Sequence, residues 1–299
     1  MKRQIIIILA LLLRIGAVTA QKVPDNCISG VFSVSADKKV YFSKGNLQYQ
    51  PSSNTWRFAE KQYTLLDDNP ETHTTTSYTA TSIDWIDLFG WGMWLDEIND
   101  KSMITNTSTD NSEYAPTLSE KNNSDTSLDD YLLDDYVEYY VFANNKKTID
   151  GVEWMTLSYS EWYYLRFIRN NGSDLWGVAM VNGVNGMIIL PDQWLDPEPD
   201  GKVFRSGVAS NNGVEYFKTL NEYTAEQWSM MEAAGAVFLP AAGCRKGLSV
   251  RDVCCDGFYW LSASYDNENA RRLYFNSSFV SLHRYYCHYG FSVRLVRPL

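Results

Sequence analysis

The chain has 299 residues, of which 45% are hydrophobic and 14% aromatic, so a sizeable core can form and disorder of the whole chain is excluded. Its formal net charge of −10 argues against a nucleic-acid partner, because nucleic-acid-binding proteins use basic patches to displace counterions. The acidity is most simply a source of solubility.

The first twenty residues predict an export signal. Lys2 and Arg3 precede an apolar run from Ile5 to Leu13, and the small residues of Val18–Ala20 follow. We expect cleavage between Ala20 and Gln21. The alternative is a membrane anchor, but the run is shorter than a spanning helix and an arginine ends it. We therefore expect a secreted or surface-exposed chain with no transmembrane span after cleavage.

Residues 21–299 are expected to form one domain that begins with short strands. Turn residues separate the β-rich runs Gly30–Ser35, Lys39–Phe42 and Asn46–Tyr49. The glycine-punctuated run Ile83–Gly92 predicts a buried loop or a short helix.

Residues 99–145 predict a surface excursion, because they are rich in Ser, Thr, Asn and Asp. Four aspartates near its end could suggest a calcium site: Asp129, Asp130, Asp134 and Asp135. They lack EF-hand spacing, so a solvated helix face is the better interpretation.

Two helices are predicted from their capping residues. Ser158 and Glu161 form one capping box, followed on one face by Trp162, Leu165 and Ile168.

Thr224 and Gln227 form the second capping box, with Trp228, Met231 and Ala234 on the buried face and Gly235 at the end.

Further strands surround these helices. Asn182-Gly183 is a strong hairpin-turn dipeptide between apolar runs at 178–181 and 187–190. Later strands are expected at 236–239, 258–260, 272–275 and 291–296. Few helices among many short antiparallel strands predict an α+β fold.

The sequence carries no familiar catalytic signature. A nucleophile elbow, an HExxH metal motif, a phosphate-binding glycine loop and a dinucleotide fingerprint are all missing. Of the three histidines, His73 lies in a threonine-rich loop with no partner in view. An acid–base pair among the 36 carboxylates is not excluded by sequence.

The five cysteines leave two interpretations open: a disulfide framework, or single thiols that arose by chance diversification and have no disulfide role. Four of them lie in the last sixty residues: Cys244, Cys254, Cys255 and Cys287. One or two disulfides are an option in an exported protein, but the odd count leaves a thiol over. The spacing does not fit a zinc site.

The segment from Ser277 to Phe291 has neither strand alternation nor a helical stripe, and it is dense in Tyr, His, Arg and Phe. Such a composition is typical of binding surfaces. Core packing is the alternative, but histidines, arginine and cysteine are poor core material, so we expect exposure. After Glu268 the chain also lacks Lys, Glu, Gln, Met and Trp, which codons ending in a pyrimidine cannot encode.

Several motifs together resemble the secreted major-paralogous-domain proteins of gut Bacteroidales. The motifs are GVFSVS (30–35), KVYFSKGNLQY (39–49), WIDLFGWG (85–92), GVNG (183–186), AVFLPAAG (236–243), YWLSAS (259–264) and SVRLVR (292–297). That family is related to the formylglycine-generating-enzyme type of the C-type lectin fold. The helix start TLSYSEW (156–162) and the closing GFSVR (290–294) resemble motifs of those enzymes.

The resemblance implies a C-type lectin-like domain with a variable ligand-binding region at about 244–291, because several members are targets of diversity-generating retroelements. It assigns six residues to the scaffold: Tyr259, Trp260, Phe275, Asn276, Val293 and Arg294. It assigns twelve residues to ligand contact: Arg271, Arg272, Tyr274, Phe279, Ser281, His283, Arg284, Tyr285, Tyr286, His288, Tyr289 and Phe291.

The resemblance therefore implies a binding protein for a protein or glycan ligand, without a cofactor. Two alternatives are a copper oxidase of the formylglycine-generating type and a structural subunit of a surface assembly. The copper-binding cysteine pair of those enzymes is not reproduced here, since Cys254-Cys255 is a poor substitute, and lectin-type calcium motifs are missing. We therefore expect a protein that is not an enzyme.

Overall fold

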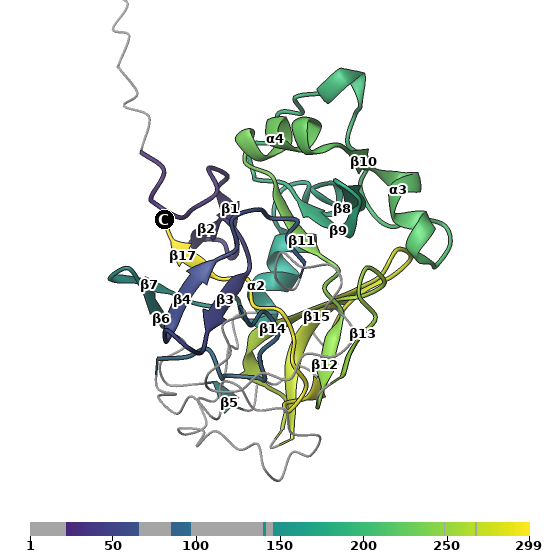
Figure 1. Cartoon of the computed structure of the whole chain (residues 1–299). Coiled ribbons are helices and arrows are strands. Elements are labelled where there is room, and N and C mark those ends of the chain that lie inside the picture. The colour runs from purple at the N-terminus through teal and green to yellow at the C-terminus, as the bar shows by residue number, and fades with distance from the viewer. Residues whose placement is uncertain (1–21, 66–84, 97–139, 142–145, 248, 267) are drawn as a thin grey trace, which may run out of the picture.

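The computed structural model describes residues 22–65, 85–96, 140–141, 146–247, 249–266 and 268–299 (Figure 1). In these ranges three short α-helices accompany many short, mostly antiparallel strands, which confirms the expected α+β class. None of the helices there has the length and apolar character needed to cross a membrane. The predicted signal segment, His73, the four aspartates and all of the polar excursion except Tyr140–Val141 lie outside the described residues.

The first sheet joins the two ends of the described chain. Its strands, in spatial order, are β1 (Phe32–Ser33), β2 (Lys39–Phe42) and β17 (Val296–Pro298). All pairs are antiparallel, and the last of them places Val296 opposite Phe42. The strand predicted at 39–42 is confirmed, whereas the one predicted at 30–35 is shorter.

Two antiparallel ribbons lie beside this sheet on the left of Figure 1. They are β3 (Leu47–Gln50) with β4 (Thr55–Phe58), and β6 (Lys147–Ile149) with β7 (Val152–Trp154).

The second sheet lies in the upper right of Figure 1. Its order is β10 (Glu222–Tyr223), β8 (Trp176–Val181), β9 (Val184–Ile189) and β11 (Val237–Pro240). The turn between β8 and β9 is Asn182-Gly183, with φ of 48° and 79°. Two successive positive φ angles match the twist of a tight hairpin, and glycine adopts them without a steric penalty. The predicted hairpin is confirmed.

Both predicted capping boxes are formed. Helix α2 (Tyr159–Tyr163) begins after Ser158, whose hydroxyl accepts from Glu161 N at 3.2 Å while Ser158 N donates to Glu161 Oε2 at 2.8 Å. Helix α4 (Ala225–Ala233) begins in the same way after Thr224. Helix α3 (Phe217–Leu220) is a single turn.

The predicted inward position of Ile168 is wrong. The chain leaves α2 into a π-helical turn, Tyr164–Ile168, in which Arg169 N donates to Tyr164 O five residues back. The wider turn shifts the helical phase, so Trp162 and Leu165 are buried and Ile168 is 48% exposed.

The third sheet carries the C-terminal region. Its order is β16 (Val280–Tyr286), β15 (Asn269–Phe275), β14 (Gly257–Ser264) and β5 (Tyr140–Val141), all antiparallel. A ribbon of β12 (Cys244–Lys246) and β13 (Ser249–Arg251) lies near it (Figure 1). Strand β16 forms although its sequence shows no strand alternation, because cross-strand pairing with β15 stabilises it.

The strand predicted at 291–296 is also mostly wrong. Phe291 and Ser292 form isolated bridges to the loop at Phe89 and to Tyr259, and a regular strand begins only at β17.

Strands β14 and β15 divide the core into two clusters. Phe258, Trp260 and Ala270 face one cluster, which contains Phe291. Tyr259, Leu261, Leu273 and Phe275 face the other, together with the apolar residues of β2, β8 and β11. Side chains of a strand alternate between its faces, so both faces of this sheet are covered.

Residues 85–96 form a buried loop. A buried loop is one of the two forms predicted for the glycine-punctuated run that begins at Ile83. Two tryptophans attach this loop to β14: Trp260 Nε1 donates to Phe89 O at 2.6 Å, and Trp91 Nε1 donates to Leu261 O at 2.9 Å.

Candidate functional site

The β15–β16 hairpin sorts most of the twelve predicted contact residues onto two faces. Arg272 lies opposite His283, and Tyr274 lies opposite Ser281. Arg271 lies opposite Arg284, on the other face. Because cross-strand partners point to the same side of a sheet, the two arginines of β15 have different surroundings.

Arg272 lies inside a box of aromatic rings. Its guanidinium carbon is 4.7 to 4.9 Å from the ring centroids of Phe258, Tyr274 and Tyr285, and 5.9 Å from that of Phe291. The side chain is 8% exposed, and its Nε and Nη1 have no hydrogen-bond partner. The electron-rich ring faces therefore replace the hydration that the cation loses.

Burial lowers the pKa of Arg272 to about 10, with the nearby Tyr285 and Tyr274 opposing that change. The guanidinium is therefore still charged at neutral pH. The cation lies against the rings of Tyr274 and Tyr285 at the same time. It therefore fixes the positions of these two half-buried side chains.

Tyr274 is held at its hydroxyl as well. Its OH donates to Asp256 Oδ1 at 3.1 Å and accepts from Asn276 Nδ2 at 2.9 Å. Burial raises the pKa of both Tyr274 and Asp256; Asp256 raises that of Tyr274 further, whereas the hydrogen bond from Tyr274 opposes the rise at Asp256. The ring thus has a fixed orientation at the edge of the aromatic box.

The other face of the hairpin connects to α2. The guanidinium of Arg271 lies 5.0 Å from the ring centroid of Tyr159 and 4.7 Å from that of Tyr265. Arg284 lies 4.0 Å from the same Tyr265 ring. Arg271 is buried and Arg284 is exposed, so only the outer arginine is available to a ligand.

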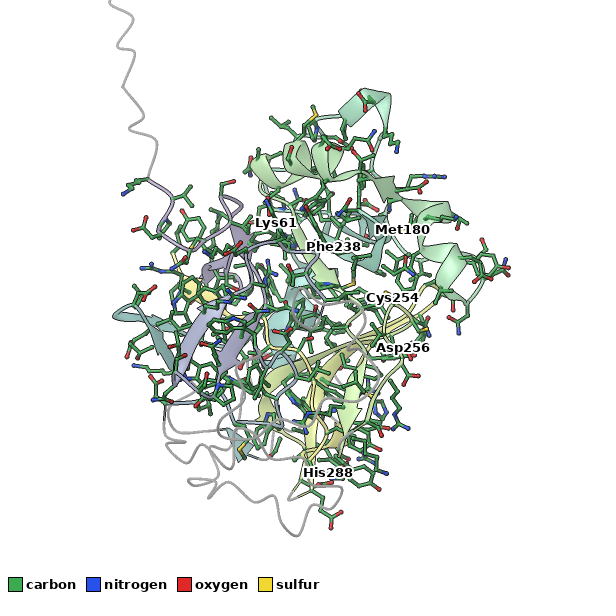
Figure 2. The ribbon with its side chains drawn as sticks, viewed as in Figure 1. Lys61, Met180, Phe238, Cys254, Asp256 and His288 are labelled. Atoms are coloured by element: carbon green, nitrogen blue, oxygen red, sulfur yellow. The ribbon has the colours of Figure 1, made fainter. Side chains whose placement is uncertain are left out.

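The segment after β16 folds back into the core. Tyr285 packs edge to face on Tyr289 at 4.6 Å between centroids, and His288 is 4.9 Å from Tyr289. The hydroxyl of Tyr289 accepts from Arg251 Nη2 at 3.2 Å. The backbone of Cys287 is tied on both sides, to Glu268 O through its N–H and to Trp91 N through its carbonyl. This segment is therefore a rigid end to the hairpin (His288, Figure 2).

The twelve residues fall into three groups by exposure. Phe279, His283, Arg284 and Tyr286 are exposed; Tyr274, Ser281 and Tyr285 are half-buried; Arg271, Arg272, His288, Tyr289 and Phe291 are buried. Phe279 is 54% and Tyr286 is 47% exposed, whereas Phe291 is fully buried. The expected exposure of the tail is therefore wrong for His288, Tyr289 and Phe291.

All six residues assigned to the scaffold are buried, as expected. Three residues that sequence analysis did not single out support the hairpin: Arg251, Asp256 and Tyr265. They lie outside the tyrosine-rich run, and no local pattern connects them to it.

All five cysteines are free thiols, so the structure contains no disulfide framework. Burial raises the pKa of Cys27 to about 11, and burial also raises the pKa of Cys244, Cys254, Cys255 and Cys287. Each sulfur is therefore protonated at neutral pH, in contrast to reactive thiolates. Across the described residues, no three His, Cys, Asp or Glu side chains are grouped so that they could hold a metal ion.

Comparison with known proteins gives no relative for this chain: no protein-family model, curated protein or solved structure matches it.

Proposed function

We propose that this chain is an exported binding protein, not an enzyme, and a member of the secreted major-paralogous-domain proteins with a C-type lectin-like fold. Its ligand is a protein or a glycan on another surface. The sequence motifs support the family, and the α+β architecture and the burial of all six scaffold residues are in keeping with it.

The observation that carries the binding function is the arrangement of the β15–β16 hairpin. Strand β15 is almost entirely buried, whereas β16 carries exposed His283, Arg284 and Tyr286 and is preceded by exposed Phe279. Aromatic residues and arginine dominate the energetics of protein recognition, and rigid rings lose little entropy on binding. The arginine box lies on the face of the hairpin that carries His283, and it supplies that rigidity there.

The experiment compares two triple variants of the purified chain without residues 1–20. One removes exposed hairpin side chains (Phe279→Ser, His283→Ser, Tyr286→Ser). The matched control removes exposed apolar side chains elsewhere: Ile168→Ser, Leu195→Ser and Met230→Ser.

Each protein is labelled and applied to a printed glycan array and to a phage-displayed peptide library. We expect to find ligands that bind the wild type and the control equally well but do not bind the hairpin variant. Ligands retained equally by the hairpin variant, or no ligand in either format, contradict it.

The proposal also limits which positions can be diversified. If a retroelement acts on this gene, an adenine-bearing near-copy of the last coding segment lies downstream, beside a reverse transcriptase. Among isolates we expect substitutions at Phe279, Ser281, His283, Arg284 and Tyr286, and few at Arg272 or Phe291, since the latter two are buried. Identical tails in all isolates would contradict diversification and leave a single dedicated ligand.

A further inference from the structure

A second surface feature lies between the loop at 201–205, α3 and β10. It is an open pocket of about 430 Å³. Its neighbour Met180, which pairs with Glu222 of β10, lies toward the opposite end of the molecule from His288 (Figure 2). Small-molecule sites have volumes of about 300–1,000 Å³, so the pocket has the size of one.

Three cations line this pocket in a chain whose net charge is −10: Lys202, Arg205 and Lys218. None of the three forms an ion pair with a described carboxylate. By contrast, Lys38, Lys146, Lys147 and Arg169 each pair with one. The pocket therefore concentrates positive charge that the described part of the protein does not neutralise.

Two of the cations are held in place by neutral oxygen atoms. Lys202 Nζ donates to Glu222 O at 2.7 Å and to Gln227 Oε1 at 3.0 Å. Arg205 Nη2 donates to Thr219 O at 3.3 Å, and the buried Asn221 side chain accepts from Arg205 N at 2.9 Å. Such partners orient a cation without cancelling its charge, which leaves that charge for an anionic ligand.

The nearby aspartates accept hydrogen bonds from other groups and form no ion pair with these cations. Asp196 accepts from the backbone N–H groups of Glu198 and Phe204, and Asp200 accepts from Gln227. Of the residues that line the pocket, Glu222 is the one carboxylate. The balance of the lining is thus three positive charges against one negative charge.

We propose that this pocket binds a small molecule that carries a phosphate or sulfate group. Arg205 binds the oxyanion through its planar fork, and Lys218 and Lys202 add point charges. Leu220 and the exposed Val203, which also line the pocket, contact the remainder of the ligand. No residue of the hairpin lines this pocket, and the hairpin turn reaches only the segment before α3, where Ser277 Oγ accepts from Gly213 N at 3.0 Å.

The test is isothermal titration of the chain without residues 1–20 with glucose 6-phosphate, glucose 6-sulfate and glucose. We expect saturable binding of at least one of the two esters and none of glucose. The ester that binds distinguishes a phosphate site from a sulfate site. The double variant Arg205→Gln/Lys218→Gln should weaken binding by about tenfold or more.

The control Lys39→Gln/Lys61→Gln makes the same charge change at two exposed lysines elsewhere and should leave the affinity unchanged. Glu222→Gln should tighten binding, because it removes the one carboxylate of the lining. Three results overturn the proposal: no binding of either ester at about 10 mM, equal binding by the pocket variant, or equal losses in both double variants.

Discussion

The hairpins β8–β9 and β15–β16 are both antiparallel pairs with continuous register, but they serve different purposes. In β8–β9, both strands are buried almost throughout and carry no charged side chain. In β15–β16, the inner strand contains two buried arginines and the outer strand is half exposed. The first hairpin is core, whereas the second one holds a displayed strand on a rigid support.

The two hairpins differ in the contacts that compensate for the lost hydration of their buried polar groups. The β8–β9 pair has two buried polar side chains: the Asn185 amide donates to Val214 O and Cys254 O, whereas Trp176 Nε1 has no hydrogen-bond partner. The β15–β16 pair buries Arg271 and Arg272 and packs aromatic rings around both guanidinium groups. Tyrosines that surround a cation keep one edge toward solvent, so the same residues can support the hairpin and border its surface.

The largest expected effect is a difference in the free energy of unfolding between variants of two predicted contact residues, one buried and one exposed. Phe291→Ala should lower the free energy of unfolding by about 3–5 kcal/mol, because it opens a cavity beside Trp260 and Phe258. Phe279→Ala, at an exposed position, should change it by less than about 0.5 kcal/mol. Urea unfolding followed by tryptophan fluorescence measures both, and similar losses in the two variants would show that the hairpin is not divided as described.

A smaller effect tests the arginine box. Arg272→Ala should cost about 2–3 kcal/mol by leaving a cavity between the rings, whereas Arg272→Met fills the space without a buried charge and should cost less than about 1 kcal/mol. Ligands that bind the wild type but not the hairpin triple variant should bind Arg272→Met more weakly if the cation orders Tyr274 and Tyr285. An unchanged stability of Arg272→Ala would show that the rings pack without it.

The capping box of α4 gives an effect of about 1 kcal/mol on the side of the molecule that carries β8–β9. Thr224→Ala removes the oxygen that accepts from Gln227 N and should destabilise the chain by about that amount. Ser229→Ala in the same helix is the control, with a change below about 0.5 kcal/mol. Neither variant should alter ligand binding at the hairpin, and a loss of binding in Thr224→Ala would indicate that the two regions are coupled.

The smallest effect concerns the pH dependence contributed by Asp256. Burial raises its pKa in the folded chain, so the unfolded chain loses this proton at lower pH than the folded chain does. Stability from this group is therefore greatest below its ordinary pKa and falls as pH rises toward the folded value. Asp256→Asn should remove that fall, so the variant gains stability relative to the wild type as pH rises above about 4, the ordinary pKa of an aspartate. A difference that is constant with pH would contradict the assignment.

Sequence predicted the features that depend on neighbours along the chain. The two capping boxes and the Asn182-Gly183 turn act within four residues, and all three are formed as expected. The position of Ile168 was not predictable, because a π-helical turn leaves no clear pattern in the sequence.

The division of the tail depends on contacts between distant residues. Arg271 and Arg272 are identical in type and adjacent, yet they are buried against Tyr159 and Phe258, which lie on different elements. A sequence rich in Tyr, Arg and His indicates a binding surface in general, but only the register with β15 shows which side chains reach solvent.

The most direct test of this account is a pair of display libraries built on the chain without residues 1–20. One library randomises Phe279, Ser281, His283, Arg284 and Tyr286; the other randomises the buried Arg271, Arg272, His288, Tyr289 and Phe291. Both are selected for binding to hen egg lysozyme, an unrelated target. The account predicts folded binders from the first library and mostly unfolded, non-binding clones from the second. Equal numbers of folded binders from the two libraries would contradict the claim that β15 and its aromatic box support a displayed surface on β16.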